Sequence, residues 1–334
     1  MHKPPITHSQ QSINLLAIVA VATLLVWFSM SFFSFRITHQ YYDNMLIAAR
    51  KSQIAGIVIR SAKERLGLLM TEEIDPNRTG LIGPEYSTIT TSLGILEAKR
   101  TTTNPDLAAA FVRTISRLNF LPGDAIVLVL SGSFPGANIA SIMAVESLGL
   151  KPIIVHSLGS SMFGATDPEF NWLEIYAELF SKGILDKQAG FVVLGGDGSA
   201  AVNMESAGVT ALRASVQRIG IQLLEKRPTS ALIDAVEAEV NGLLEPGRTV
   251  ALLNVGGSLI GLGTCMNSDK FPVGIIRKKI VCQDGIPGLM VRFSNRGIPI
   301  IHALNIRRLA KQWNLPYDPQ PLPTIGNNLR VYGN

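Results

Sequence analysis

Uninterrupted apolar runs alternate with helical patterns through the middle of the chain. One run covers 125–130, and others lie at 152–156, 191–194 and 249–253. Apolar strands without polar alternation are typical of parallel sheets that are buried on both faces. Because helical patterns separate the strands, we predict an α/β, Rossmann-like fold: a mostly parallel sheet with helices on both faces.

The pattern changes towards the carboxyl end. Residues 273–282 and 289–293 are expected to pair as strands, and residues 298–302 read as a further strand. A short basic helix is predicted at 305–313.

A long apolar stretch lies near the amino terminus. Residues 13–35 contain no Asp, Glu, Lys or Arg, and at about 1.5 Å per residue such a helix crosses the ~30 Å core of a bilayer. The stretch ends in bulky residues, among them Phe33 and Phe35, which disfavours a cleaved signal peptide. We therefore predict a single-pass transmembrane helix that anchors the chain in the cell membrane, with the lipid bilayer as a partner. The side of the membrane is left open.

Five segments follow from these patterns. The amino-terminal tail at 1–12 and the anchor at 13–35 precede a helical stalk and loop region at 36–104. The α/β domain is predicted at 105–315. Several prolines then favour an extended carboxyl-terminal tail at 316–334.

Composition argues against several classes of function. The net charge of +5 is modest for 334 residues, and the short basic runs at 277–279 and 307–308 do not indicate nucleic acid. Cys265 and Cys282 have the spacing of neither a zinc site nor a redox motif, and the five histidines are scattered. No metal site and no specific cofactor is therefore predicted.

Small polar turns follow four of the predicted strands. Because the carboxyl ends of parallel strands share one edge of a sheet, the turns should converge there, where backbone amides at a helix start bind anions. Two cationic residues near a predicted helix start complete the set, and a carboxylate, phosphate or amide is the expected ligand. The predicted ligand-binding residues are Lys99, Arg100, Ser131, Gly132, Ser133, Asn138, Gly159, Ser160, Gly196, Asp197, Asn254, Gly256, Gly257 and Ser258.

Catalytic chemistry is less specific in the sequence. Ser131 or Ser133 could be a nucleophile if a base lay beside it, and His156 is the histidine near a strand end. Asp167 or Asp197 could orient that histidine. The motif G-x-S-x-G is absent, so the two serines are favoured as hydrogen-bond donors over nucleophiles.

The run Gly196–Ala201 matches the dinucleotide pattern G-x-G-x-x-A. No second strand ending in an acidic residue follows at the expected distance. A nucleotide-binding Rossmann-like protein is therefore kept as an alternative hypothesis.

Several motifs, taken as a set, resemble one known family. They are Gly80–Ser87, Glu97–Thr101 with Asn104-Pro105, Ser131–Pro135 with Asn138, Gly164-Ala165 with Asp167-Pro168, and Pro299–His302. This set resembles the poly-gamma-glutamate system proteins, which are PgsW-like, whereas Thr166 and Asn171 depart from the family's pattern. The resemblance implies an amino-terminal membrane segment and a part in making or exporting poly-gamma-glutamate, a capsule polymer. It implies no catalytic residue.

Three functions are consistent with these features. The first is a membrane-anchored accessory protein of poly-gamma-glutamate biosynthesis or export, whose Gly/Ser turns bind an anionic gamma-glutamyl ligand or a partner subunit. The second is a serine-dependent amidohydrolase or transferase acting on gamma-glutamyl bonds. The third is the nucleotide-binding protein. Whether the chain is an enzyme is left open.

Overall fold

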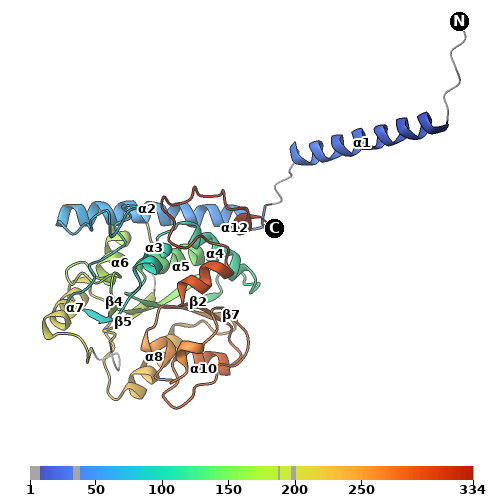
Figure 1. Ribbon diagram of the computed structural model, residues 1–334. Coiled ribbons are helices and arrows are strands. Elements are labelled where there is room, and N and C mark those ends of the chain that lie inside the picture. Colours follow the sequence, from blue (N-terminus) through green and yellow to red (C-terminus); the bar gives the residue numbers. More distant parts are fainter. Residues whose placement is uncertain (1–7, 33–37, 187–188, 197–200, 334) are drawn as a thin grey trace, which may run out of the picture. The chain divides into compact units, whose positions relative to one another are not determined.

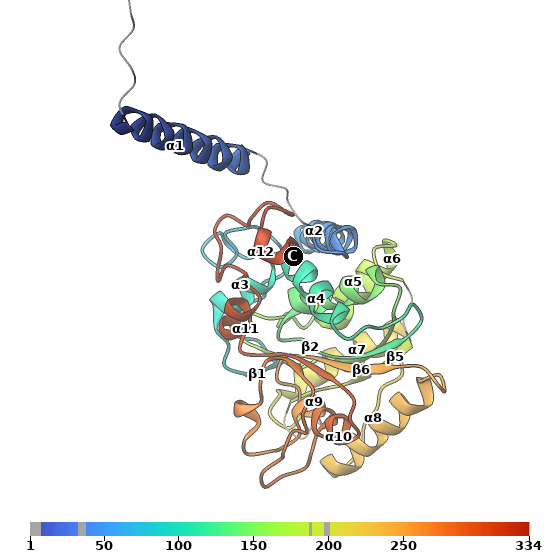
Figure 2. The same cartoon turned by 90° about the vertical axis from the view of Figure 1, so that its right-hand side faces the viewer.

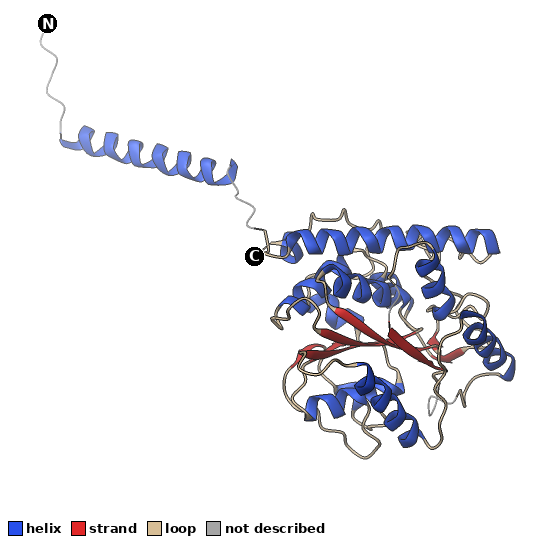
Figure 3. Ribbon diagram, turned by 180° about the vertical axis from the view of Figure 1, so that it is seen from behind, coloured by secondary structure: helices blue, strands red, loops and turns tan. Residues whose placement is uncertain are grey.

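A six-stranded sheet lies at the centre of the computed structural model, with strand order β5-β3-β2-β6-β8-β7 (Figure 3). Its strands are β2 (Ala125–Ser131), β3 (Lys151–Ser157), β5 (Ala189–Val193), β6 (Val250–Val255), β7 (Gly274–Ile276) and β8 (Ile300–Ala303). β7 runs antiparallel to β8, and all other neighbours are parallel, so the sheet is mixed. A small parallel sheet joins β1 (Thr90–Ser92) to β4 (Ser160–Ser161). The structure describes residues 8–32, 38–186, 189–196 and 201–333.

The order of the parallel strands defines a reversal point in the sheet. Taken in chain order, β2, β3, β5, β6 and β8 are the first to fifth parallel strands, and they lie side by side in the order 3-2-1-4-5. In such a doubly wound sheet, the connections leave in opposite directions from the two strands at the reversal. Those strands are β2 and β6, and ligands typically bind beyond their carboxyl ends. The predicted α/β class is confirmed.

Helices cover both faces of the sheet (Figures 1 and 2). α4 (Asp106–Ser116), α5 (Pro135–Ser147) and α6 (Trp172–Ser181) lie on one face, with α2 (Tyr42–Leu66) packed across them. α8 (Thr229–Leu243), α9 (Leu259–Leu262) and α10 (Leu289–Asn295) lie on the other. The remaining helices are α3 (Leu96–Thr102), α7 (Ser206–Ile219), α11 (Ile306–Gln312), α12 (Leu329–Tyr332) and the short 3-10 helix η2 (Ser268–Lys270). Each face of the sheet has its own hydrophobic core: the first lies beneath α4, α5 and α6, and the second beneath α8, α9 and α10. Successive residues of β2 point into different cores, Leu128 into the first and Val129 into the second. This explains why the strands lack polar alternation.

The predicted membrane anchor is not supported. The amino-terminal helix α1 covers His8–Phe32 and starts with polar residues, and residues 33–35 of the predicted span lie outside the described residues. Within the described ranges, no helix combines the length and the apolar character needed to cross a bilayer. The prediction of a transmembrane segment at 13–35, with its single-pass topology and cell-membrane location, is therefore wrong.

The boundaries of the compact units also differ from the predicted segments. Gln40–Tyr332 form one unit, and Met1–His39 with Gly333–Asn334 form the other. α2 belongs to the first unit because its buried side chains, including Met45 and Ile59, join the core beneath it. Residues 40–104 of the expected stalk and loop region are thus part of the α/β unit, and so is most of the expected tail.

One predicted strand is a helix. Residues 289–293 form the first part of α10, and the partner of β8 is the short strand β7. Leu289, Met290 and Phe293 are buried against the second core. Their spacing fits one face of a helix as well as it fits a strand, so tertiary packing decides between the two.

Cys265 and Cys282 form a disulfide that closes a loop with a sequence separation of 17. The enclosed segment contains little regular structure, and the cross-link restricts the unfolded chain. We expect replacement of both cysteines by serine to lower the free energy of unfolding by about 3 kcal/mol. Urea unfolding of the variant and of the oxidised parent measures this difference, and coincident unfolding curves would contradict the expectation.

Candidate functional site

The Gly/Ser turns meet at the carboxyl edge of the sheet. Gly132, after β2, lies so close to the turn after β3 that an added Cβ would be 2.6 Å from the carbonyl oxygen of Leu158. Gly195, after β5, packs on Gly159 in the same way, at 2.7 Å from its nitrogen. On the other side, a Cβ on Gly256 would be 2.9 Å from the Cβ of Ser131. The four turns therefore pack against one another as one continuous cluster.

The reversal point between β2 and β6 is lined by amide and hydroxyl groups. Asn138 Nδ2 donates to the carbonyl of Ser131 at 2.8 Å, and Asn254 Nδ2 donates to the carbonyl of Gly256 at 2.8 Å. Ser258 follows in the turn after β6, and its neighbour Gly257 is exposed. Doubly wound sheets bind ligands beyond the ends of these two strands, so we use the name crevice for the group Ser131, Asn138, Asn254, Gly256 and Ser258.

Three polar atoms of the crevice residues are buried and have no hydrogen-bond partner. They are Asn138 Oδ1, Asn254 Oδ1 and Ser258 Oγ. Both asparagines have 0% exposed surface, and Ser258 has 7%. A buried polar atom without a partner costs about 1–3 kcal/mol, so a cluster of them is expected to be satisfied by a bound ligand or water.

The start of α5 adds backbone donors to the crevice. Pro135 begins the helix and has no N–H, whereas the amides of Gly136 and Ala137 have no acceptor within the helix. The positive end of the helix dipole favours a negative group at this position. The crevice residues thus combine donors for an anion with two amide oxygens that lack a donor, of which Asn254 Oδ1 packs against Gly261 of α9.

A chain of hydroxyl groups leads away from the crevice along the edge. Ser131 Oγ donates to Ser133 Oγ at 3.0 Å, and Ser133 Oγ accepts from the backbone N–H of Ser161 at 3.0 Å. Ser160 Oγ donates to the carbonyl of Gly132 at 3.1 Å. The predicted donors Ser131 and Ser133 therefore fix the turns to one another.

Lys99 reaches this chain from α3. Its Nζ donates to the carbonyl of Ser133 at 2.6 Å, lies 2.5 Å from Ser161 Oγ, and sits 3.9 Å from the centre of the Phe134 ring. Burial, which leaves only 2% of the residue exposed, lowers the pKa of Lys99 to about 7. Lys99 is thus part of the edge, as predicted, but it lies beneath the surface.

Arg100 has a structural partner instead of a ligand. Its guanidinium binds both carboxylate oxygens of Asp318, at 2.8 and 2.7 Å. This bidentate pair joins α3 to the carboxyl-terminal segment. We therefore leave Arg100 out of the site.

The structure does not bring the predicted base to the predicted nucleophiles. His156 packs against the rings of Trp172 and Tyr176, and its Nδ1 has no hydrogen-bond partner. Burial lowers the pKa of His156 to about 3. Asp167 Oδ1 accepts from the backbone of Glu169. A triad of Ser131 or Ser133 with His156 and Asp167 is not formed.

Two predicted features, the side chain of Asp197 and the dinucleotide pattern Gly196–Ala201, involve residues 197–200. These residues lie outside the described part of the chain, so the structure does not place Asp197 or most of the pattern. Gly196 is described, and its backbone nitrogen lies where a Cβ on Gly159 would meet it. Within the part of the chain that is described, no cluster of three metal-ligating side chains occurs.

Sequence reasoning missed two contacts at this edge. His302, at the end of β8, lies 3.2 Å from Asn254 Nδ2 through its Nδ1. Ser161 is not among the predicted residues, and its contact with Lys99 spans 62 positions in the chain. The apolar strand before His302 could have indicated the first contact, whereas no local pattern indicates the second.

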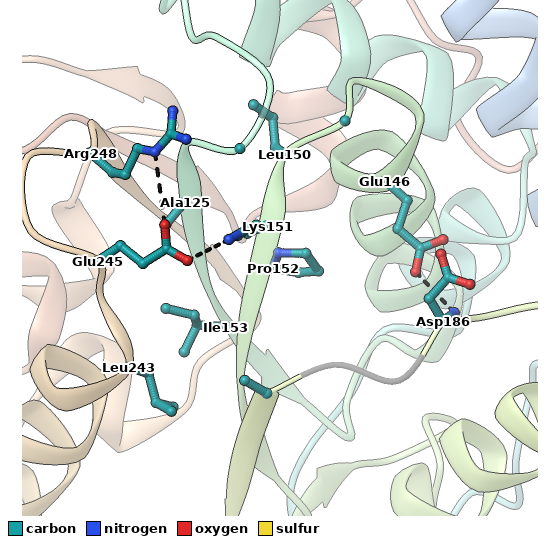
Figure 4. Close-up of a pocket in the computed structure, with 13 residues that line it drawn as sticks. Ala125, Glu146, Leu150, Lys151, Pro152, Ile153, Asp186, Leu243, Glu245 and Arg248 are labelled. Atoms are coloured by element: carbon teal, nitrogen blue, oxygen red, sulfur yellow. Dashed lines mark hydrogen bonds and ion pairs between the residues drawn. The ribbon is translucent and has the colours of Figure 1, made fainter.

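A cavity of about 500 Å³ lies at the opposite edge, beside the amino ends of β2 and β3 (Figure 4). Glu245 forms ion pairs there with Lys151 and Arg248, and Asp186 N donates to Glu146. Its charged groups bind one another, and it lies away from the edge where doubly wound sheets bind ligands. We therefore place the candidate site at the carboxyl edge.

Comparison with known proteins adds no functional assignment. The chain matches no protein-family model and no curated protein. Among solved structures, it aligns with the crystal structure of O-ureido-L-serine synthase at 12% identity, over 64% of this chain and 68% of that chain, with a TM-score of 0.18. A score this low supports no conclusion about fold or activity.

Proposed function

We propose that the chain is an accessory protein of a poly-gamma-glutamate synthesis or export system, and that its crevice binds a gamma-glutamyl chain. The motifs from Gly80 to His302 that resemble the poly-gamma-glutamate system proteins support the first part. The position of the crevice at the reversal point of the sheet supports the second.

The unpartnered atoms of Asn138, Asn254 and Ser258 are the observation that carries the ligand assignment. A gamma-glutamyl chain offers carboxylates, which suit the Ser258 hydroxyl and the amides at the start of α5. It also offers amide N–H groups, which suit the oxygens of the two asparagines. A simple inorganic anion has only acceptors and would leave these oxygens unsatisfied.

Gamma-linked tetraglutamate is therefore expected to bind more tightly than alpha-linked tetraglutamate, which has the same numbers of carboxylate and amide groups at different spacing. In the variant Ser258→Ala, binding of the gamma-linked peptide should weaken about tenfold, which corresponds to about 1.4 kcal/mol. Isothermal titration calorimetry measures both differences. Because the Ser258 hydroxyl has no partner in the free protein, the variant should fold as stably as the parent.

Ser181→Ala is the matched control, since this exposed hydroxyl on α6 bonds only to its own helix, at the carbonyl of Glu178. It should leave peptide affinity unchanged. Equal affinity for the two linkages, or unaltered affinity in Ser258→Ala, would refute the assignment of the crevice.

A further inference from the structure

Lys99 and Ser161 form a side-chain pair that ligand binding in the crevice does not require. Nζ and Oγ are 2.5 Å apart, within the range for direct proton transfer. The two residues come from different elements, α3 and β4. We propose that Ser161 is a nucleophile and Lys99 its general base, and that the pair transfers acyl groups from an amide or ester.

The surroundings of Lys99 differ from those of a lysine buried only for structure. Lys63 is the comparison within this chain: it is equally buried and donates to the carbonyl of Ile82. Burial lowers the pKa of Lys63 to about 8, and the charges of Asp167 and Asp75 oppose this shift. Lys99 instead faces a carbonyl, a hydroxyl and a ring, none of which carries a titratable charge. Desolvation without a counter-charge favours the neutral amine, which is the form that accepts a proton.

The geometry around Ser161 is fixed from three sides. Its backbone N–H donates to Ser133 Oγ, and its carbonyl accepts from Gly164 N at 3.1 Å. The carbonyl of Ser133 holds Lys99 Nζ from the other side at 2.6 Å. The turn after β2 therefore holds both the backbone of Ser161 and the amine of Lys99, and this preorganisation lowers the cost of aligning the two side chains.

Exposure divides the two roles. Ser161 keeps 8% of its surface exposed, whereas Lys99 keeps 2%. Ser161 is thus the less deeply buried of the two, which fits a nucleophile that must meet the acyl donor, with the amine behind it. A general base needs contact with the nucleophile and not with the substrate.

The reaction follows from these positions. Ser161 Oγ attacks the carbonyl carbon while its proton passes to Lys99 Nζ, and the leaving amine or alcohol then takes that proton as the carbon–nitrogen or carbon–oxygen bond breaks. Water attacks the resulting ester of Ser161 and gives one proton to Lys99. That proton returns to Oγ as the acid is released. The reaction as written requires neither a metal ion nor a redox partner.

Phenylmethanesulfonyl fluoride tests the pair without knowledge of the substrate. Attack by Ser161 forms a sulfonate ester and releases fluoride, with the serine proton taken up by Lys99. Intact-mass measurement and peptide mapping should locate one adduct, on Ser161. Its rate of formation should rise from about pH 5 to about pH 9, with a midpoint near the pKa of Lys99 at about 7.

Three variants separate the roles. Ser161→Ala should remove the adduct, Lys99→Met should slow its formation at least about 100-fold, and the control Ser181→Ala should change nothing. If Lys99→Met does not fold, the site of labelling in the parent protein and its pH dependence still test the proposal. An unlabelled parent at high pH, an adduct on another residue, or full reactivity in a folded Lys99→Met would overturn the proposal.

Binding of gamma-linked tetraglutamate to Ser161→Ala keeps this proposal apart from the previous one. The variant leaves the crevice residues intact and should bind the peptide as the parent does. Loss of labelling with retained binding supports both proposals. A parent that binds the peptide and is never labelled overturns the acyl-transfer proposal alone, and a labelled parent that does not bind the peptide overturns the ligand assignment alone.

Discussion

Acidification from pH 6.5 to about 4 should remove on the order of 6 kcal/mol from the free energy of unfolding, about 3 kcal/mol for each of two buried histidines. Burial lowers the pKa of His156 from 6.5 to about 3 and that of His302 from 6.5 to about 4. Below pH 6.5 the two histidines are therefore protonated in the unfolded chain while they remain neutral in the folded chain. Stability is complete above pH 6.5 and falls as the pH falls through this window.

The variant His156→Leu isolates one of the two contributions. Leucine can pack against Trp172 and Tyr176 but does not titrate, so the slope of unfolding free energy against pH should decrease by about one proton between pH 6.5 and 4. Urea unfolding at several pH values gives both slopes. The carboxylates contribute equally to parent and variant, and identical slopes would show that His156 is not responsible.

Removal of residues 316–334 should destabilise the α/β unit by at least about 4 kcal/mol, or prevent soluble folding. Asp318 binds Arg100 through two hydrogen bonds, and Tyr332 Oη donates to Asp106 Oδ1 at 2.6 Å. Val331 and Tyr332 are buried, with 0% and 1% exposed surface. The truncation leaves Arg100 and the buried Asp106 without these partners and opens the core beneath α12.

Single substitutions test the same segment in a chain that still folds. Asp318→Asn keeps the size of the side chain but removes its charge, and about 2 kcal/mol should be lost with the bidentate pair. Leu329→Ala is the control on the same segment, because Leu329 is 56% exposed and should change stability by no more than about 0.5 kcal/mol. Denaturant midpoints compare the three proteins. Equal effects of both substitutions would contradict a specific role for Asp318.

The sheet was predictable because its strands are buried on both faces. The apolar runs at 125–130 and 249–253 fall within or overlap β2 and β6, and the turns after them meet as expected. Residues 289–293 were not predictable in this way, since a short apolar run fits a strand and a helix alike. The long run without charged residues near the amino terminus was misleading, because the absence of charge over a sufficient length was taken to define a membrane span.

The site was predictable in position but not in chemistry. Strand-end turns identify the edge, and Asn138, Asn254 and Ser258 lie there as expected. Burial of Lys99 is a tertiary property: the sequence shows only a cationic residue near a predicted helix start, and Phe134 and Ser161 contact it only in the folded chain. The same packing separates Lys99 from Arg100, neighbours in sequence with different partners.

The close contact of Gly132 with the turn after β3 has a consequence for how this chain tolerates mutation. Even a methyl group at position 132 would meet the carbonyl of Leu158 at 2.6 Å, and one at Gly256 would meet Ser131 at 2.9 Å with the backbone at a φ of +84°. Neither obstacle is a flexible side chain that could move aside. Random mutagenesis would therefore recover few folded variants at these two positions, so the backbone packing of the turns limits how far this edge of the sheet can change.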